Sequence, residues 1–113
     1  MPKMLRGSDV VARDLEIART PMTRLVGLGF RQDFPSGKGL LITPCNSVHT
    51  FWPRFAIDVV FLTADFRIVR ICARLAHKRL SPIVWQAHQV LELPAGTAES
   101  LALEPGQSLT LSE

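Results

Sequence analysis

At 113 residues, the chain has the length of one domain and can bury about two-thirds of the surface that its unfolded form would expose. Its 47% hydrophobic and 20% charged residues exclude a disordered chain, which would be poorer in large apolar residues and carry more net charge. The formal net charge of +3 favours acidic partners only weakly, so nucleic acid is an unlikely partner. We expect a single domain over residues 1–113, with residues 1–10 as a flexible terminus.

The amino terminus lacks the apolar core of a secretory signal, and no stretch approaches the roughly 18 uninterrupted apolar residues of a membrane-spanning helix. We therefore expect a cytoplasmic protein without a membrane span, although a processed exported form would have the same features. Cys45 and Cys72 are too few for a disulfide framework and lack the close spacing of metal ligands. We expect no metal and no cofactor.

The first predicted elements are a strand and a short helix. Residues 14–18, DLEIA, alternate charged and apolar side chains as a strand does. A helix near residues 20–29 follows, with Thr20 as N-cap and Pro21 as its first residue, where the missing N–H costs nothing. Gly27 and Gly29 are expected to end this helix, because glycine readily adopts the left-handed conformation of a C-cap.

Beyond the helix, short β-branched or aromatic runs bounded by turn residues predict strands. These runs are residues 39–42, 47–52, 57–62, 67–75, 89–94 and 108–112. A helical turn at 97–100 interrupts them. About seven short strands with one short helix predict a mainly β fold, as a small sandwich, a jelly roll or a partly closed barrel.

Two carboxylates stand out within strands that are otherwise apolar. Asp58 is at the start of a run, IDVVFL, whose two faces are both apolar. Glu92 lies in the middle of VLELP, between Val90 and Pro94 on one face, with Leu91 and Leu93 on the other. A buried carboxylate is costly without a partner, so each should have one. The candidate cations are Arg31, Arg54 and His49.

Two hypotheses account for these residues. In the first, Asp58 and Glu92 anchor loops through backbone N–H groups or arginines, and His49 is a core-edge histidine. In the second, the three residues share a cleft that binds a small polar ligand or performs general acid–base catalysis. We favour a module that binds a small ligand or a protein over a small enzyme, for example a hydrolase. The predicted binding residues are His49, Thr50, Phe51, Trp52, Arg54, Asp58 and Arg31, and the catalytic candidates are His49, Asp58 and Glu92.

Residues 66–91 contain five Lys or Arg residues and no acidic residue, which on strands indicates a solvated face. By strand alternation, Arg70 and Arg74 share one face with Cys72, while Arg67 lies on the other, and no aromatic residues interleave with the charges. The pattern therefore predicts weak, salt-sensitive binding of nucleic acid at most.

Four ordered blocks carry a resemblance to a known family. GLGFR, GKGLLI, VHTFWPRFAIDVVFL and VLELPAG resemble, in this order, the bacterial and archaeal family catalogued as domain of unknown function 192, over about residues 15–111. The resemblance implies a mainly β fold of sandwich or jelly-roll type and no established activity. The chain departs from the usual family residues (Met, Met, Pro and Gly-Asp) at Gly29, Pro53, Ala56 and Gly106-Gln107. No role that needs a thioether at position 53 is expected.

Overall fold

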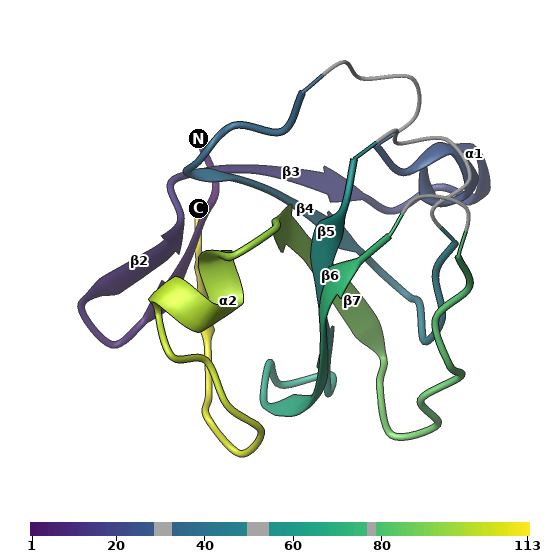
Figure 1. The fold of residues 1–113 in the computed structure, drawn as a ribbon. Helices are drawn as coiled ribbons and strands as arrows, with labels where there is room; N and C mark the ends of the chain where they lie inside the picture. The colour runs from purple at the N-terminus through teal and green to yellow at the C-terminus, as the bar shows by residue number, and fades with distance from the viewer. Residues whose placement is uncertain (29–32, 50–54, 77–78) are drawn as a thin grey trace.

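The computed structural model describes residues 1–28, 33–49, 55–76 and 79–113. These residues contain eight strands and two short helices (Figure 1). The elements are β1 (Lys3–Arg6), β2 (Asp9–Ala12), β3 (Asp14–Ala18), α1 (Pro21–Val26), β4 (Lys38–Ile42), β5 (Ile57–Leu62), β6 (Ile68–Leu75), β7 (Gln89–Pro94), α2 (Thr97–Ser100) and β8 (Thr110–Ser112). The mainly β prediction is confirmed, and neither of these helices is long and apolar enough to cross a membrane.

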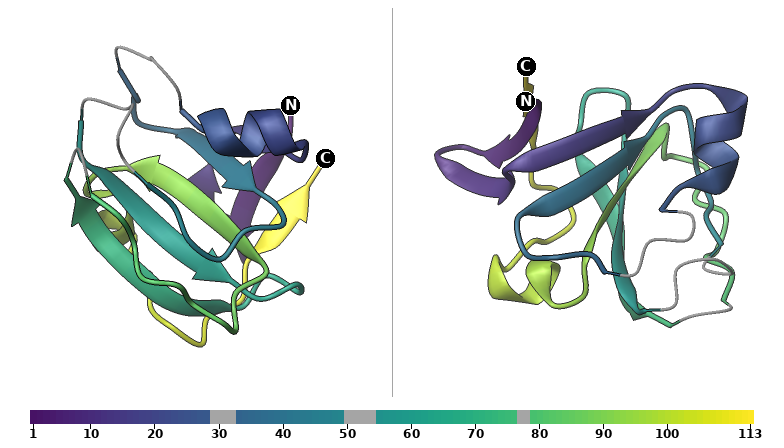
Figure 2. Two further views of the ribbon diagram at one scale, coloured as in Figure 1. Left: turned by 90° about the vertical axis from the view of Figure 1, so that its right-hand side faces the viewer. Right: turned by 90° about the horizontal axis from the view of Figure 1, so that it is seen from above.

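The strands form two open sheets and no closed barrel. One sheet has three strands in the order β2-β1-β8, and the other has five in the order β3-β4-β7-β5-β6. Strands β3 and β4 pair in parallel, and the other neighbours pair antiparallel. Both chain ends belong to the small sheet, where β1 pairs with β8, and Figure 2 shows them side by side in both views.

The five-stranded sheet is covered on both faces, so its central strands carry apolar side chains in both directions. One face packs against residues of β1, β2 and α2, including Met4, Val11 and Ala98. The other face packs against Leu28 and the chain around Val48 and Val84. All six residues of β5 are buried as a consequence.

Two expectations about the chain were wrong. Residues 1–10 are no flexible terminus, because β1 and β2 form a hairpin whose turn contains Gly7 at φ 59°. This hairpin places Met4 in the core, but its strands are too short to give a clear alternating pattern. The strand expected at 47–52 is absent at 47–49, where only an isolated bridge joins His49 to Leu80; residues 50–52 lie outside the described part of the chain.

Asp58 connects three elements on the α2 side of the large sheet. Its side chain is 0% exposed, and its two carboxylate oxygens accept the backbone N–H groups of Arg74 and Ala98, each at 2.9 Å. Ala98 lies in the first turn of α2, whose N-cap Gly96 has no side chain to offer, so Asp58 caps the helix from β5. The prediction that Asp58 is buried and bonded to backbone N–H groups is confirmed.

We expect Asp58→Asn to lower the free energy of unfolding by about 1–3 kcal/mol. The reason is that the NH2 group of asparagine would replace one hydrogen-bond-accepting carboxylate oxygen and would face a backbone N–H, which is also a donor. Urea unfolding measures the change. Glu99→Gln is the matched control, since the Glu99 side chain is 78% exposed and should change stability by less than about 0.5 kcal/mol. An Asp58→Asn protein as stable as the control would contradict the capping role.

Candidate functional site

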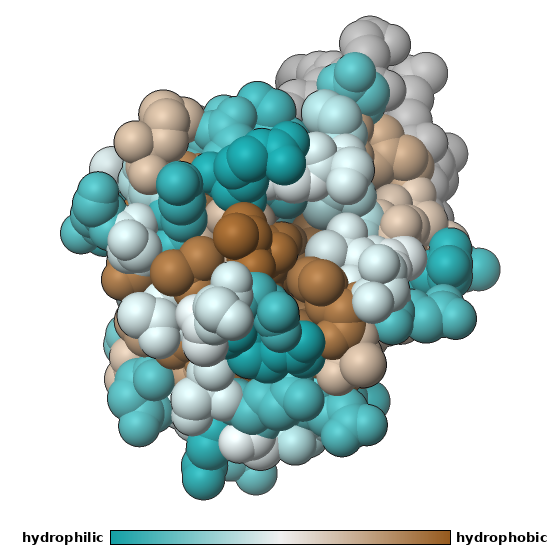
Figure 3. Space-filling model, turned by 90° about the vertical axis from the view of Figure 1, so that its left-hand side faces the viewer, coloured by the Kyte–Doolittle hydropathy of each residue, from teal (hydrophilic) through white to brown (hydrophobic). Residues whose placement is uncertain are grey.

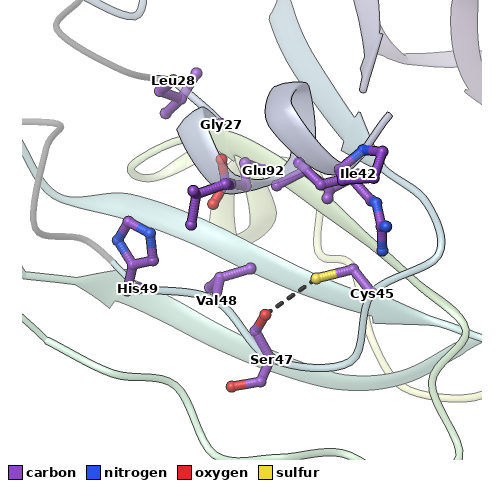
Figure 4. Close-up of a pocket in the computed structure, with 11 residues that line it drawn as sticks. Gly27, Leu28, Ile42, Cys45, Ser47, Val48, His49 and Glu92 are labelled. Atoms are coloured by element: carbon purple, nitrogen blue, oxygen red, sulfur yellow. Dashed lines mark hydrogen bonds between the residues drawn. The ribbon is translucent and has the colours of Figure 1, made fainter. Parts of the chain in front are cut away.

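A cavity of about 320 Å³ lies between helix α1 and the large sheet, on the face opposite to Asp58. Ile42 of β4 and Glu92 of β7 line it from the sheet, and residues 45, 47, 48 and 49 line it from the following segment. Figure 4 shows Glu92 between His49 on one side and Cys45 on the other. Its polar lining residues are Arg24, Cys45, Ser47, His49 and Glu92.

Helix α1 forms one wall of the cavity, and its sequence fixes both of its ends. The Thr20 hydroxyl accepts the N–H of Thr23 at 3.1 Å, and the Thr23 hydroxyl accepts the N–H of Thr20 at 3.0 Å, which makes a reciprocal cap. Gly27 ends the helix at φ 56°, and its N–H donates to the Thr23 carbonyl at 2.9 Å. A Cβ at this glycine would lie 3.8 Å from Glu92 Oε1, so Gly27 keeps space above that carboxyl.

The opposite wall is fixed by hydrogen bonds between two loops. Cys45 N–H donates to the His88 carbonyl at 2.7 Å, and Val48 N–H donates to the Ser81 hydroxyl at 2.8 Å. Ser81 N–H donates back to the Val48 carbonyl at 2.9 Å. Arg24 ties the helix to the same wall, because its Nη1 donates to the Pro44 carbonyl at 3.0 Å.

Glu92 is the unusual group in this cavity. Its residue is 3% exposed, and among the described residues no donor or cation pairs with its carboxyl group. Burial raises the pKa of Glu92 from its ordinary 4.5 to about 8, because the ionised form has lost water without gaining a partner. At neutral pH Glu92 is therefore mostly a neutral acid that can donate one hydrogen bond and accept others.

Cys45 lies in the same cavity as a protonated thiol. Its Sγ donates to the Ser47 carbonyl at 3.0 Å. Burial raises the pKa of Cys45, and the nearby Glu92 raises it further, while the charge of Arg24 lowers it. A thiol with a raised pKa is a weak nucleophile at neutral pH. Across the described ranges, no three His, Cys, Asp or Glu side chains come together as a metal site requires.

The structure brings together only some of the residues that the sequence singled out. His49 and Glu92 line the cavity, whereas Asp58 points to the other face of the sheet, since it pairs with Leu93 while Glu92 pairs with Val59. Thr50, Phe51, Trp52, Arg54 and Arg31 lie outside the described residues.

Sequence reasoning missed Arg24, Cys45 and Ser47 as cavity residues. Cys45 and Ser47 belong to an irregular segment without periodicity, and Arg24 lies on a six-residue helix. One local signal existed. Cys45 and Ser47 lie three and five residues after the end of β4, which is buried from Gly39 to Ile42. A chain that leaves the core at this point is expected to carry polar side chains at the core's edge.

A second hollow, of about 560 Å³, lies on the face formed by β2 and α2. Figure 3 shows this face, with apolar surface at its centre and hydrophilic side chains around it. Val10, Val11 and Leu101 contribute apolar side chains, and Arg13 is exposed at its edge. Among the described residues that line this hollow, none is a buried titratable side chain, so the smaller cavity beneath α1 is the better candidate site.

The raised pKa of Glu92 predicts a specific pH dependence. Between its ordinary 4.5 and about 8, the unfolded chain ionises Glu92 while the folded chain retains the proton. The free energy of unfolding therefore loses up to about 1.4 kcal/mol per pH unit from this group as the pH rises. Glu92→Gln removes that loss. In urea unfolding, the free energy of unfolding of the variant should therefore rise relative to that of the wild type from about pH 5 to about pH 8. A difference that does not change with pH would contradict the assignment, and Glu99→Gln is the control.

Nearly the whole chain matches one protein family. Residues 4–111 match a protein family described as uncharacterized ACR, DUF192, or domain of unknown function 192. The match begins earlier than the resemblance at residue 15 and takes in β2 and all of β1 except Lys3. No curated protein matches the chain.

Two crystal structures have a similar fold. One is a protein of unknown function from Novosphingobium aromaticivorans DSM 12444, with a TM-score of 0.82 and 24% identity over 97% of this chain and 84% of that one. The other, from Sinorhizobium meliloti 1021, is named as a candidate transcription regulator and has a TM-score of 0.78 and 23% identity over 96% of this chain and 90% of that one. At these identities the likeness concerns the fold alone. The match over residues 4–111 shows that the chain belongs to the DUF192 family.

Proposed function

We propose that this protein is a small-molecule-binding module whose ligand occupies the cavity beneath α1 and meets Glu92. The observation that carries the proposal is a glutamate that is 3% exposed, lines a cavity and has no partner for its carboxyl group among the described residues. The cavity volume of about 320 Å³ lies at the lower end of the range for small-ligand sites.

The cost of Glu92 supports this proposal. An unpaired carboxyl group in the interior destabilises the folded state, because the ionised form loses its hydration without compensation. The apolar neighbours Leu40, Ile42 and Val90 pack on the same face, and a side chain of their kind would remove that cost. Groups that lower stability without a structural partner are typical of functional sites.

Binding is favoured over catalysis by what the other candidates do. Both oxygens of Asp58 are occupied by backbone N–H groups on the opposite face, so it is not available to assist Glu92 or His49. The raised pKa of Cys45 disfavours a nucleophilic thiolate. The catalytic alternative is reduced to Glu92 as a general acid beside His49.

A fragment screen by ligand-detected NMR tests the proposal. We expect binders whose affinity falls at least about tenfold in Glu92→Gln, a loss of about 1.4 kcal/mol, and stays unchanged in Glu99→Gln. A binder present at 100 times its Kd should also stabilise the fold by about 2.7 kcal/mol in thermal unfolding. Fragments that bind both variants equally well would place the ligand elsewhere and contradict the proposal.

Nucleic acid is not part of the proposed function. Two register irregularities between β5 and β6 break the alternation expected for the basic residues. Arg70 pairs with Phe61, and Arg74 stands in a bulge at φ 53° with its Nη2 3.3 Å from Glu99 Oε2. The basic residues therefore form no continuous stripe along β6, and one of them already pairs with an acid.

We expect no submicromolar affinity for DNA or RNA at physiological salt. Fluorescence anisotropy with labelled single- and double-stranded oligonucleotides measures it, and binding at low salt should vanish as salt is raised, since only a few phosphate contacts are available. Tight binding that Arg70→Gln abolishes would move the functional surface from the cavity to β6.

A further inference from the structure

We propose that the ligand is a small bipolar molecule, with an ammonium or other cationic nitrogen at the Glu92 end and a carboxylate or similar anion at the Arg24 end. This inference rests on the proposed function and specifies its ligand class. Its basis is that the cavity wall carries one acidic and one basic side chain, neither of which has an ionic partner among the described residues.

The acidic end lies on β7. Glu92 is held between Leu91 and Leu93 in a strand buried from Gln89 to Leu93, so its backbone position is fixed by sheet pairing. A cationic nitrogen in the cavity would supply the missing countercharge and make the ionised carboxylate favourable again. Glu92 would then lose its proton when such a ligand binds near neutral pH.

The basic end lies on α1. The Arg24 guanidinium is positioned by the bond from Nη1 to the Pro44 carbonyl, which leaves its charge uncompensated. Its Nε is buried without a hydrogen-bond partner, so the group's donors are not all used within the described chain. A carboxylate can accept two hydrogen bonds from one guanidinium and neutralise it at the same time.

Cys45 lies near both charged groups, because Glu92 raises the pKa of its thiol and Arg24 lowers it. Among the described residues no salt bridge joins Arg24 to Glu92, and the pKa of Glu92 is raised by burial without a lowering contribution from a cation. Besides these three, His49 is the remaining titratable group that lines the cavity among the described residues. Gly27 lines the same cavity and places no side chain over Glu92 Oε1, from which a Cβ at this position would be 3.8 Å away.

Straight-chain ω-aminocarboxylates test the inference, because chain length varies the separation of their charges. Isothermal titration with 3-aminopropanoate to 6-aminohexanoate should give a length optimum. At that length the aminocarboxylate should bind at least tenfold tighter than the alkylamine or alkylcarboxylate of equal length. Titration in two buffers of different ionisation enthalpy should show about one proton released per ligand at pH 7, since Glu92 is then mostly protonated.

Variants assign each end. Glu92→Gln should abolish the gain in affinity that the amino group confers, and it should also abolish the proton release. Arg24→Gln should abolish the gain in affinity that the carboxylate confers. Arg19→Gln, which changes an exposed arginine just before the helix, should change neither. Thermal unfolding of each variant confirms that it is folded.

The outcomes separate this inference from the proposed function. Aminocarboxylates that bind no tighter than their single-ended analogues, or that do not bind at all, overturn the ligand class. The proposed function still stands in that case if other fragments bind in a Glu92-dependent way. If neither aminocarboxylates nor fragments depend on Glu92, both fail.

Discussion

Both faces of the five-stranded sheet are covered, and this constraint decides the chemistry of every side chain on its central strands. Strands β5 and β7 run through the middle of that sheet, so any polar residue on them is buried whichever way it points. Each strand carries one carboxylate, Asp58 and Glu92. Because the two strands pair with Asp58 opposite Leu93 and Glu92 opposite Val59, the carboxylates emerge on different faces.

The two carboxylates have opposite roles because their surroundings differ. Asp58 faces a bulge of β6 and the first turn of α2, which offer two backbone N–H groups, and its charge is used to join three elements. Glu92 faces a cavity beneath α1, and within the described residues nothing offers it a donor. A carboxylate on a central strand thus joins structural elements on one face and lines the proposed ligand cavity on the other.

The walls of the cavity depend on local sequence more than on the sheet. The reciprocal cap of Thr20 and Thr23 and the left-handed Gly27 confine α1 to six residues above Glu92. The segment around Cys45 has no regular structure of its own and is held by bonds to Ser81 and His88. The proposed site therefore has a floor of paired strands and walls made of short elements and loops.

The sequence by itself determined strands β3 to β8, the helix start and the burial of both carboxylates, but not the hairpin of β1 and β2. Alternation, capping and turn residues act over a few positions, which is why these features could be predicted locally. The runs 57–62 and 89–94 coincide with β5 and β7, and Pro21 begins α1 as predicted. Only the tertiary structure decided the register between β5 and β7, since one residue of shift would place Asp58 and Glu92 on the same face. It also decided that Arg24 and Cys45 line the same cavity as Glu92, because the proximity of an irregular segment, a short helix and a distant strand leaves no periodic pattern in the chain.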